Sequence, residues 1–196
     1  VVALDHGATE VAGVRRMFGA MRAAGETRPG SAAVAMQADA HALPFPDGAF
    51  DLAFSNFAIY NAREPLSTLR ELRRVLEPGG EPVLIGPTRN NALELYEYNA
   101  RLTGTAIDEV TLVRTDRLRS EILPLAREVF GPVHEDVLNS RLTFPSAEEF
   151  LRYFTATMLY EQIAEKMNLG EAAMRDALAG SPLVVSKEML ALVATA

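Results

Sequence analysis

Residues 50–86 read FDLAFSNFAIYNAREPLSTLRELRRVLEPGGEPVLIG, and this stretch decides the fold of the chain. It opens with a short run rich in apolar and aromatic residues, which is typical of a buried strand. Residues 64–76 then place apolar side chains three or four positions apart behind Pro65, which predicts an amphipathic helix. The turn Pro-Gly-Gly at 78–80 ends that helix, and residues 82–86 form a second apolar run. Strand, helix and strand in this order predict a βαβ unit with a parallel pair of strands.

The residues before this unit repeat the same alternation. Residues 1–5 and 32–37 each form a short apolar run, and both runs end next to an acidic residue. Between them, residues 9–24 carry apolar side chains at helical spacing and are followed by Gly25. The first 88 residues therefore predict a doubly wound α/β sheet.

The second half of the chain predicts helices with two late strands. Helical patterns cover residues 90–102, 115–130 and 170–178, and Ser146 followed by Glu149 forms a capping box that starts another helix. Residues 134–144 alternate like a strand, and we expect the last strand, at 187–194, to pair with them. No repeat or linker interrupts the chain, so we expect a single domain over residues 1–196.

Composition excludes several classes of function. The chain has 48% hydrophobic and 23% charged residues, as in an ordinary soluble domain, and a net charge of −7 without a basic stripe, which argues against nucleic acid. The absence of cysteine rules out disulfides and thiolate chemistry, and the three histidines show no ligand spacing, so we expect no metal site. No segment has the length and hydropathy of a membrane span or the layout of a signal peptide. These features predict a cytoplasmic protein.

Polar side chains follow three of the predicted strands. Asp5, Asp39 and Asn56 each lie directly after an apolar run. Ligands of open α/β sheets bind outside the carboxyl ends of the strands, and a carboxylate there can accept both hydroxyl protons of a ribose. Because Asp and Asn are also common turn residues, each position taken alone is better explained as a simple strand end.

Two longer stretches carry a family resemblance. Residues 37–51, QADAHALPFPDGAFD, and residues 69–80, LRELRRVLEPGG, with PVLI at 82–85, resemble class I S-adenosylmethionine-dependent methyltransferases. Within that class, residues 37–51 resemble the group that contains the ubiquinone/menaquinone C-methyltransferases. The resemblance implies a Rossmann-like seven-stranded sheet with helical insertions. It implies a cofactor-binding core in residues 1–88, a variable helical substrate or lid region in 89–186 and a closing strand in 187–196.

The resemblance also assigns residues to the cofactor S-adenosylmethionine and its product S-adenosylhomocysteine. Asp5 matches the acid that binds the ribose hydroxyls, with His6 beside it. Asp39 and the backbone of Ala40 match the contact to adenine. Asn56 and Phe57 match the segment that lines the methionine end of the cofactor.

One family motif lies outside the given residues. The glycine-rich turn after the family's first strand is expected about 20 residues before Asp5, upstream of Val1. The first strand of the sheet is thus apparently missing from this chain, and we expect the natural protein to extend upstream.

The helical insertions supply candidates for acceptor binding. The expected substrate residues in the insertions are Tyr96, Phe150, Phe154 and Met158, and the helical spacing of the last three is also that of ordinary core residues. Tyr60 and Asn61, which follow the strand at residues 50–55, are also expected to reach the acceptor, although they could simply belong to a loop. A sulfonium is already a good methyl donor, so no base is obligatory, and His134 and Tyr60 are the candidates if one is needed.

The predicted function is methyl transfer to a small, partly apolar acceptor, at an oxygen, nitrogen or carbon atom, by a protein that could form a homodimer. A nicotinamide-dependent oxidoreductase shares the acid for ribose but not the Ala-Asp-Ala and Leu-Pro-Phe segments at 38–45. A noncatalytic methyltransferase-like interaction module, or a truncated fragment, is the remaining alternative.

Overall fold

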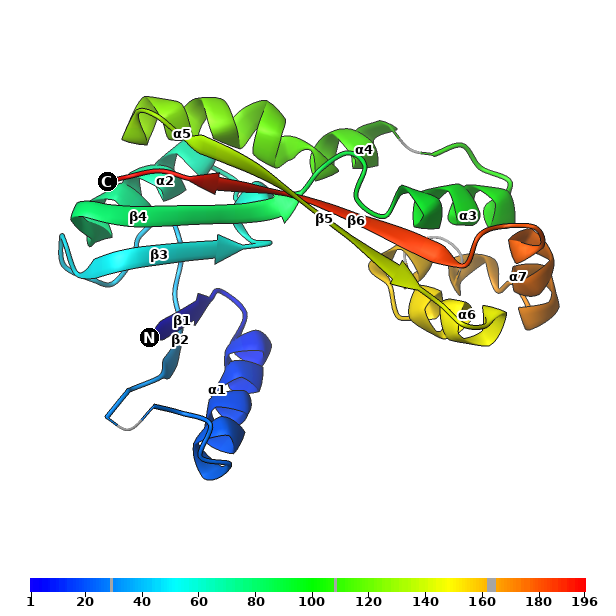
Figure 1. Ribbon diagram of the computed structural model, residues 1–196, viewed down its shortest axis with the longest axis horizontal. Coiled ribbons are helices and arrows are strands. Elements are labelled where there is room, and N and C mark those ends of the chain that lie inside the picture. Colours follow the sequence, from blue (N-terminus) through cyan, green and yellow to red (C-terminus); the bar gives the residue numbers. More distant parts are fainter. Residues whose placement is uncertain (29, 108, 162–164) are drawn as a thin grey trace.

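The computed structural model describes residues 1–28, 30–107, 109–161 and 165–196. The strands of these residues form a parallel two-stranded sheet and a mixed four-stranded sheet, and Figure 1 shows the small sheet beside the β3 edge of the large one. Within the described residues no helix is both long and apolar enough to cross a membrane.

The small sheet is the first βαβ unit. Strand β1 (Val2–Asp5) pairs in parallel with β2 (Val34–Gln37), and α1 (Ala8–Ala23) connects them. Arg15 fixes the helix on the sheet, since its Nε donates to the carbonyl oxygen of Ala35 at 2.9 Å. The strands and the helix predicted for residues 1–37 are confirmed.

The large sheet begins with the second βαβ unit. Strand β3 (Phe50–Asn56) runs parallel to β4 (Leu76–Pro87), and α2 (Pro65–Val75) joins them with its proline in the first turn. β4 starts earlier than the predicted residue 82 because Leu76 already pairs with Phe50, ahead of an irregularity in the register. Gly79 lies at this irregularity, between the partners Leu76 and Glu81, and its φ of +88° is in the left-handed region that glycine adopts readily.

The late strands close the other edge of this sheet. Strand β6 (Val184–Val193) pairs antiparallel both with β4 and with β5 (His134–Thr143), giving the order β3-β4-β6-β5. The predicted pairing of the last strand is therefore confirmed, although the strand begins at residue 184. Beyond the end of β4, β5 and β6 continue as a two-stranded ribbon toward the helices α6 and α7 (Figure 1).

The helices of the second half include one that the sequence did not predict, at Glu109–Thr115, and they differ from the prediction over residues 115–130. They are α3 (Leu93–Thr103), α4 (Glu109–Thr115), α5 (Leu123–Phe130), α6 (Ala147–Thr155) and α7 (Glu171–Leu178), with short turns η1 (Ile59–Asn61), η2 (Leu118–Ile122) and η4 (Glu165–Met167). The single helix expected over 115–130 is instead a π-helical turn, η2, followed by α5. Pro124 explains the change, because it has no N–H to donate to the preceding turn. The predicted cap of α6 is present, with Ser146 Oγ accepting from Glu149 N at 3.3 Å.

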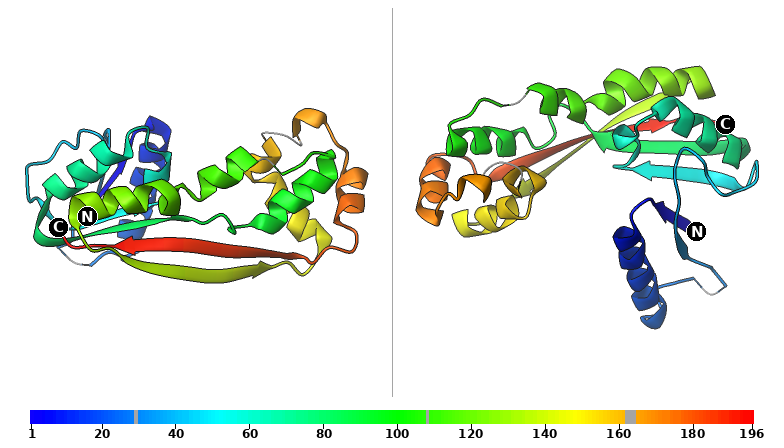
Figure 2. Two further views of the ribbon diagram at one scale, coloured as in Figure 1. Left: turned by 90° about the horizontal axis from the view of Figure 1, so that it is seen from above. Right: turned by 180° about the vertical axis from the view of Figure 1, so that it is seen from behind.

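Two apolar clusters hold the molecule together. One joins α2, η2 and α5 to β4 and β6, and the other joins α3, α6 and α7 to the start of β6. In the second cluster, the ring of Tyr98 makes T-shaped contacts with the rings of Phe150 and Phe154, at centroid distances of 5.2 and 4.7 Å. Seen from above, α2, α5, α4 and α3 follow one another along one side of the strands (Figure 2). The space between the two clusters is where a ligand cavity can form.

Candidate functional site

The carboxyl ends of β1, β2 and β3 open into a common cleft. Its cavity measures about 680 Å³ and includes residues from both sheets. The lining residues are Leu4, Asp5, His6, Gln37, Ala38, Asp39, Ala40, His41, Leu43, Ser55, Ala58, Ile59, Asn61, Ala62, Arg63 and Thr68. Four of the residues expected to bind a cofactor, Asp5, His6, Asp39 and Ala40, thus line one cavity.

Asp5 is held by the turn that follows β1. Its Oδ1 accepts a hydrogen bond from the backbone N–H of Gly7 at 2.8 Å and lies 3.4 Å from Nδ1 of His6. The turn is tight, since a Cβ on Gly7 would fall 2.0 Å from Oε2 of Glu10. The side chain of Asp5 remains 42% exposed toward the cleft, and among the described residues only its Oδ1 is hydrogen-bonded. The second carboxylate oxygen is therefore available to a ligand.

Asp39 forms a compact turn with His41. Its Oδ1 accepts from the backbone N–H of His41 at 2.9 Å and lies 2.6 Å from the ring Nδ1. Nε2 of the same ring accepts from the backbone N–H of Glu64 at 3.3 Å, an arrangement that suits a neutral imidazole protonated on Nδ1. The backbone and ring hydrogen bonds from His41 lower the pKa of Asp39. The carboxylate is thereby kept ionised and oriented.

The segment after Asp39 is fixed by a pair of residues that the sequence did not reveal. Arg74 donates to the carbonyl oxygens of Leu43 at 3.0 Å and Phe45 at 2.7 Å, and to Asp47 Oδ1 at 2.8 Å. Glu71 accepts from the backbone N–H of Leu43 at 2.8 Å. The spacing of Glu71 and Arg74 on α2 predicts an ion pair between them, but it does not predict that both side chains also bind the backbone of the distant segment. We call this pair the α2 clamp.

A second arginine fixes η1. Arg117 donates from Nη1 to the carbonyl oxygens of Tyr60 at 2.9 Å and Ala62 at 2.7 Å, and pairs with Glu121. Its hydrogen bond to Glu121 raises the pKa of the guanidinium. Because η1 follows directly after β3, this contact sets the position of the strand end at the cleft.

Asn56 and Phe57, also expected at the cofactor, do not line the cavity of the cleft. Their neighbours Ser55 and Ala58 do. Phe57 adopts a left-handed φ of +53°, and its backbone N–H donates to the carbonyl oxygen of Ile85 at 2.8 Å. The contact of Asn56 and Phe57 with a cofactor stays a prediction.

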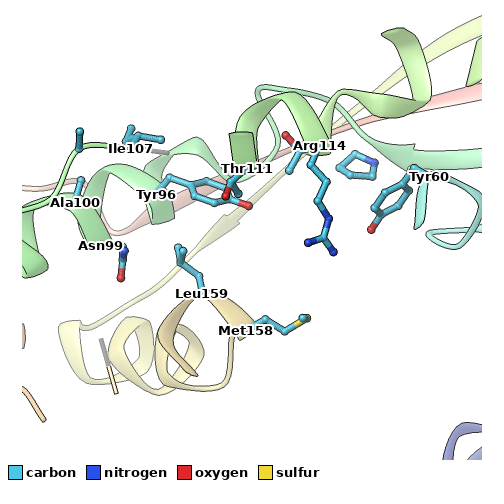
Figure 3. Close-up of a pocket in the computed structure, with 12 residues that line it drawn as sticks. Tyr60, Tyr96, Asn99, Ala100, Ile107, Thr111, Arg114, Met158 and Leu159 are labelled. Atoms are coloured by element: carbon cyan, nitrogen blue, oxygen red, sulfur yellow. The ribbon is translucent and has the colours of Figure 1, made fainter. Parts of the chain in front are cut away.

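A second cavity of about 340 Å³ lies between the sheet and the helical region. It is lined by Tyr60, Pro87, Tyr96, Asn99, Ala100, Ala106, Ile107, Thr111, Arg114, Thr115, Met158 and Leu159. The expected acceptor residues Tyr60, Tyr96 and Met158 meet here, whereas Asn61 lines the first cavity (Figure 3). Burial raises the pKa of Tyr96, so its hydroxyl stays protonated at neutral pH. The turn η1 contributes Tyr60 to one cavity and Asn61 to the other, so it separates them.

Three other expected site residues lie elsewhere. Phe150 and Phe154 are 1% and 0% exposed and pack around Tyr98, so they support α3 and line neither of these two cavities. His134 is the third of these residues, and its expected role as a possible base stays a prediction. It lies opposite Val193 on β5, the edge strand farthest from β3, where it is 71% exposed and 3.2 Å from Asp136. That position is unsuited to proton transfer at either cavity.

Residues 1–28, 30–107, 109–161 and 165–196 hold no group of three or more His, Asp or Glu side chains that could bind a metal ion.

This chain is similar to known proteins in both sequence and fold. Residues 2–84 match the family described as a methyltransferase domain. Over 71 residues the chain is 37% identical to the ubiquinone/menaquinone biosynthesis C-methyltransferase UbiE of Hahella chejuensis. That alignment covers 33% of this chain and 28% of the relative, so it spans well under half of the relative's length.

Two solved structures share the fold. The YcgJ protein of Bacillus subtilis superposes with a TM-score of 0.60 at 18% identity, covering 99% of this chain and 81% of that one. A putative methyltransferase of Bacillus halodurans gives a TM-score of 0.58 at 17% identity, covering 100% and 82%. The predicted Rossmann-like α/β fold is thereby confirmed. Residues 2–84 of the chain are thus similar in sequence to methyltransferase domains, and the chain shares its α/β fold with these two structures.

Proposed function

We propose that this protein transfers a methyl group from S-adenosylmethionine to a small, partly apolar acceptor. The observation that carries the proposal is the placement of Asp5 and Asp39 in one cleft at the strand ends, next to a second cavity across η1. In this proposal residues 1–88 bind the cofactor, residues 89–186 supply the acceptor cavity and residues 187–196 complete the closing strand. The similarity of residues 2–84 to methyltransferase domains supports the first of these assignments.

The cleft fits the chemistry of the cofactor's ribose. Oδ1 of Asp5 is occupied by the turn after β1, and the exposed remainder of the carboxylate faces the cavity. A carboxylate oxygen in this position accepts hydroxyl protons, which is the chemistry a ribose needs. Gln37 supports the geometry, because its Nε2 donates to the carbonyl oxygen of His6 at 2.8 Å and ties the ends of β1 and β2 together.

The same cleft fits an adenine ring. Leu43 and Ile59 provide apolar walls, and Asp39 lies beside Ala40 at the end of β2. The carboxylate of Asp39 can accept an exocyclic amino proton while the backbone of Ala40 contacts the ring edge. The α2 clamp holds Leu43 at this position, since Glu71 and Arg74 bind its N–H and its carbonyl oxygen.

S-adenosylmethionine supplies an activated methyl group on a sulfonium when it is bound. The protein's own contribution is then to align the acceptor with that group and to exclude water. Tyr60 and Asn61, on the turn between the two cavities, are placed to guide the alignment. Tyr60 is the remaining candidate for a base, and methyl transfer to oxygen, nitrogen or carbon is compatible with this arrangement. A cytoplasmic location, a homodimer and the lack of a nucleic-acid partner remain predictions.

Titration with S-adenosylhomocysteine by calorimetry tests the proposal. Asp5→Asn retains the acceptor for the Gly7 N–H but loses the charge at the ribose position, so we expect affinity to fall at least about tenfold. Asp176→Asn is the matched control, because Asp176 is an exposed residue of α7 away from both cavities. The wild-type protein should also gain thermal stability in saturating ligand. Failure to bind at millimolar concentration, or equal losses in the two variants, would overturn the proposal.

A further inference from the structure

The second cavity has an unusual charge composition for an acidic protein. The chain carries a net charge of −7, yet among the described residues that line this cavity Arg114 is the single charged side chain. Figure 3 shows Arg114 extending from α4 into the space between Tyr96 and Tyr60, above Met158. The remaining walls are apolar or carry hydroxyl and amide groups. The cavity is therefore locally positive and otherwise uncharged.

The guanidinium of Arg114 has no carboxylate partner within 4.0 Å among the described residues. Its one hydrogen bond there is a long one, from Nη2 to Oδ1 of Asn61 at 3.5 Å. Arg74 and Arg117, by contrast, are each paired with a glutamate. A planar guanidinium that faces a cavity without such a partner can receive a carboxylate through two parallel hydrogen bonds.

Asn99 provides an independent sign of a missing partner. Its side chain lines the same cavity, is 4% exposed, and leaves Oδ1 without a hydrogen-bond partner among the described residues. Buried polar atoms are nearly always satisfied, so an unpaired carbonyl oxygen at a cavity wall indicates a donor that arrives with a ligand. In Figure 3 Asn99 and Tyr96 project from α3, with Leu159 opposite them.

From these features we infer that the acceptor is a compact carboxylic acid, bound by its carboxylate at Arg114 and by a hydroxyl or amino donor at Asn99. The inference rests on the proposed function, because it names the substrate class of the same enzyme. A cavity of about 340 Å³ lies at the small end of the range for ligand pockets, which suits one or two rings. A single cation without a further lysine, arginine or histidine matches a monoanion better than a phosphate ester.

Matched pairs of acids and amides test the charge preference directly. Benzoate with benzamide, and 2-naphthoate with 2-naphthamide, are titrated into the protein with and without S-adenosylhomocysteine, and affinity is measured by calorimetry or ligand-observed NMR. We expect each acid to bind at least about tenfold more tightly than its amide. Arg114→Gln should abolish this preference, while Arg152→Gln, at an exposed position of α6 outside the cavity, should retain it.

The three hydroxybenzoate isomers test the role of Asn99. At least one isomer should bind more tightly than benzoate, and Asn99→Leu should remove that gain without changing the affinity for benzoate. Because Asn99 Oδ1 has no partner in the described chain, the variant should keep or exceed the wild-type melting temperature. A lower melting temperature with unchanged ligand preferences would assign Asn99 a structural role and overturn this part of the inference.

The outcomes separate this inference from the proposed function. Normal binding of S-adenosylhomocysteine with no acid preference, or with equal effects of Arg114→Gln and Arg152→Gln, would overturn the carboxylate site alone. A retained acid preference without binding of S-adenosylhomocysteine would overturn the methyltransferase proposal and leave the carboxylate site standing. The absence of any acid binding at millimolar concentration would also reject the carboxylate site.

Discussion

Arg74 donates from Nε and Nη2 to the two carboxylate oxygens of Glu71, at 2.9 and 2.8 Å, while its Nη1 reaches Phe45 and Asp47. One guanidinium thus joins α2 to the segment that carries the adenine-side residues of the cleft. That segment lies between β2 and β3 and has no strand partner of its own, so its position depends on these side-chain contacts. The hydrogen bonds from Arg74 also lower the pKa of Glu71, which keeps the pair ionised.

Arg74→Lys tests the α2 clamp. A lysine keeps the charge but cannot supply the planar set of donors, so most of the contacts to Leu43, Phe45 and Glu71 should be lost. We expect the melting temperature to fall by about 2–6 °C and S-adenosylhomocysteine to bind several-fold more weakly. Arg73→Lys, at the exposed neighbouring position, is the control. Equal behaviour of the two variants in scanning calorimetry would show that the clamp does not hold the segment.

His41→Ala should release Asp39. The two hydrogen bonds from His41 lower the pKa of Asp39 in the folded protein, and removal of the ring should shift that pKa upward. A carboxyl group with a lowered folded pKa adds stability above its unfolded pKa, and this stability is lost as the pH falls through the folded pKa, below about 4. Carboxyl-carbon NMR titration of Asp39 in both proteins measures the shift. An identical titration curve in the variant would contradict the assigned role of the His41 ring.

Tyr98→Phe should weaken the attachment of α3 to α7. The Tyr98 hydroxyl donates to the carbonyl oxygen of Met174 at 2.8 Å, so its removal should cost about 0.5–1.5 kcal/mol at neutral pH. Burial raises the pKa of Tyr98 to about 12. Because an unfolded tyrosine titrates near pH 10, this group's stabilisation is complete below pH 10 and is lost as the pH rises toward about 12.

Denaturant titrations at pH 7, 10 and 11 measure both effects of Tyr98→Phe. The wild-type protein should lose more stability than the variant between pH 10 and 11. Tyr153→Phe, on α6, is the control, since no hydroxyl hydrogen bond of Tyr153 is present in the described residues. Parallel pH profiles for all three proteins would argue against the buried hydroxyl as the source.

Arg117→Ala should loosen the turn between the two cavities. The carbonyl oxygens of Tyr60 and Ala62 lose their shared donor, and among the described residues the backbone hydrogen bonds within η1 are short-range ones. We expect amide hydrogen exchange across residues 59–62 to accelerate at least about tenfold. Arg119→Ala, which removes an exposed ion pair with Glu135, serves as the control. Exchange that is unchanged in Arg117→Ala but faster in Arg119→Ala would assign the restraint to another contact.

The sequence revealed local structure where apolar residues recur at regular spacing or where characteristic residues mark the end of a helix or strand. Apolar runs and helical spacing located the two βαβ units, and Ser146 with Glu149 marked the start of α6. Acids at the ends of β1 and β2 were expected to lie together, because parallel strands bring their carboxyl ends to one edge. The prediction missed η2 because the helical spacing of apolar residues continues through Pro124, and that spacing does not show that the proline lacks a backbone N–H.

Site residues that depend on long-range packing were harder to identify. Phe150, Phe154 and Met158 share helical spacing, yet the first two enter the core around Tyr98, while Met158 follows the end of α6 and reaches the second cavity. Periodicity gives the face of a helix but not which neighbour that face meets. The position of His134 could not be predicted for a similar reason, since strand order and register place it on the far edge strand.

The sequence by itself determined the alternating α/β order, the acids at the strand ends and the resemblance of residues 2–84 to a methyltransferase domain, because these depend on neighbouring residues in short segments. Only the tertiary structure decided that Arg114 and Asn99 share a cavity with Tyr60 and Met158, and that Arg74 reaches back to Phe45. Such contacts join residues that are far apart along the chain. The packing of the two apolar clusters brings these residues together, and a pattern within a short segment does not show which distant segments pack against each other.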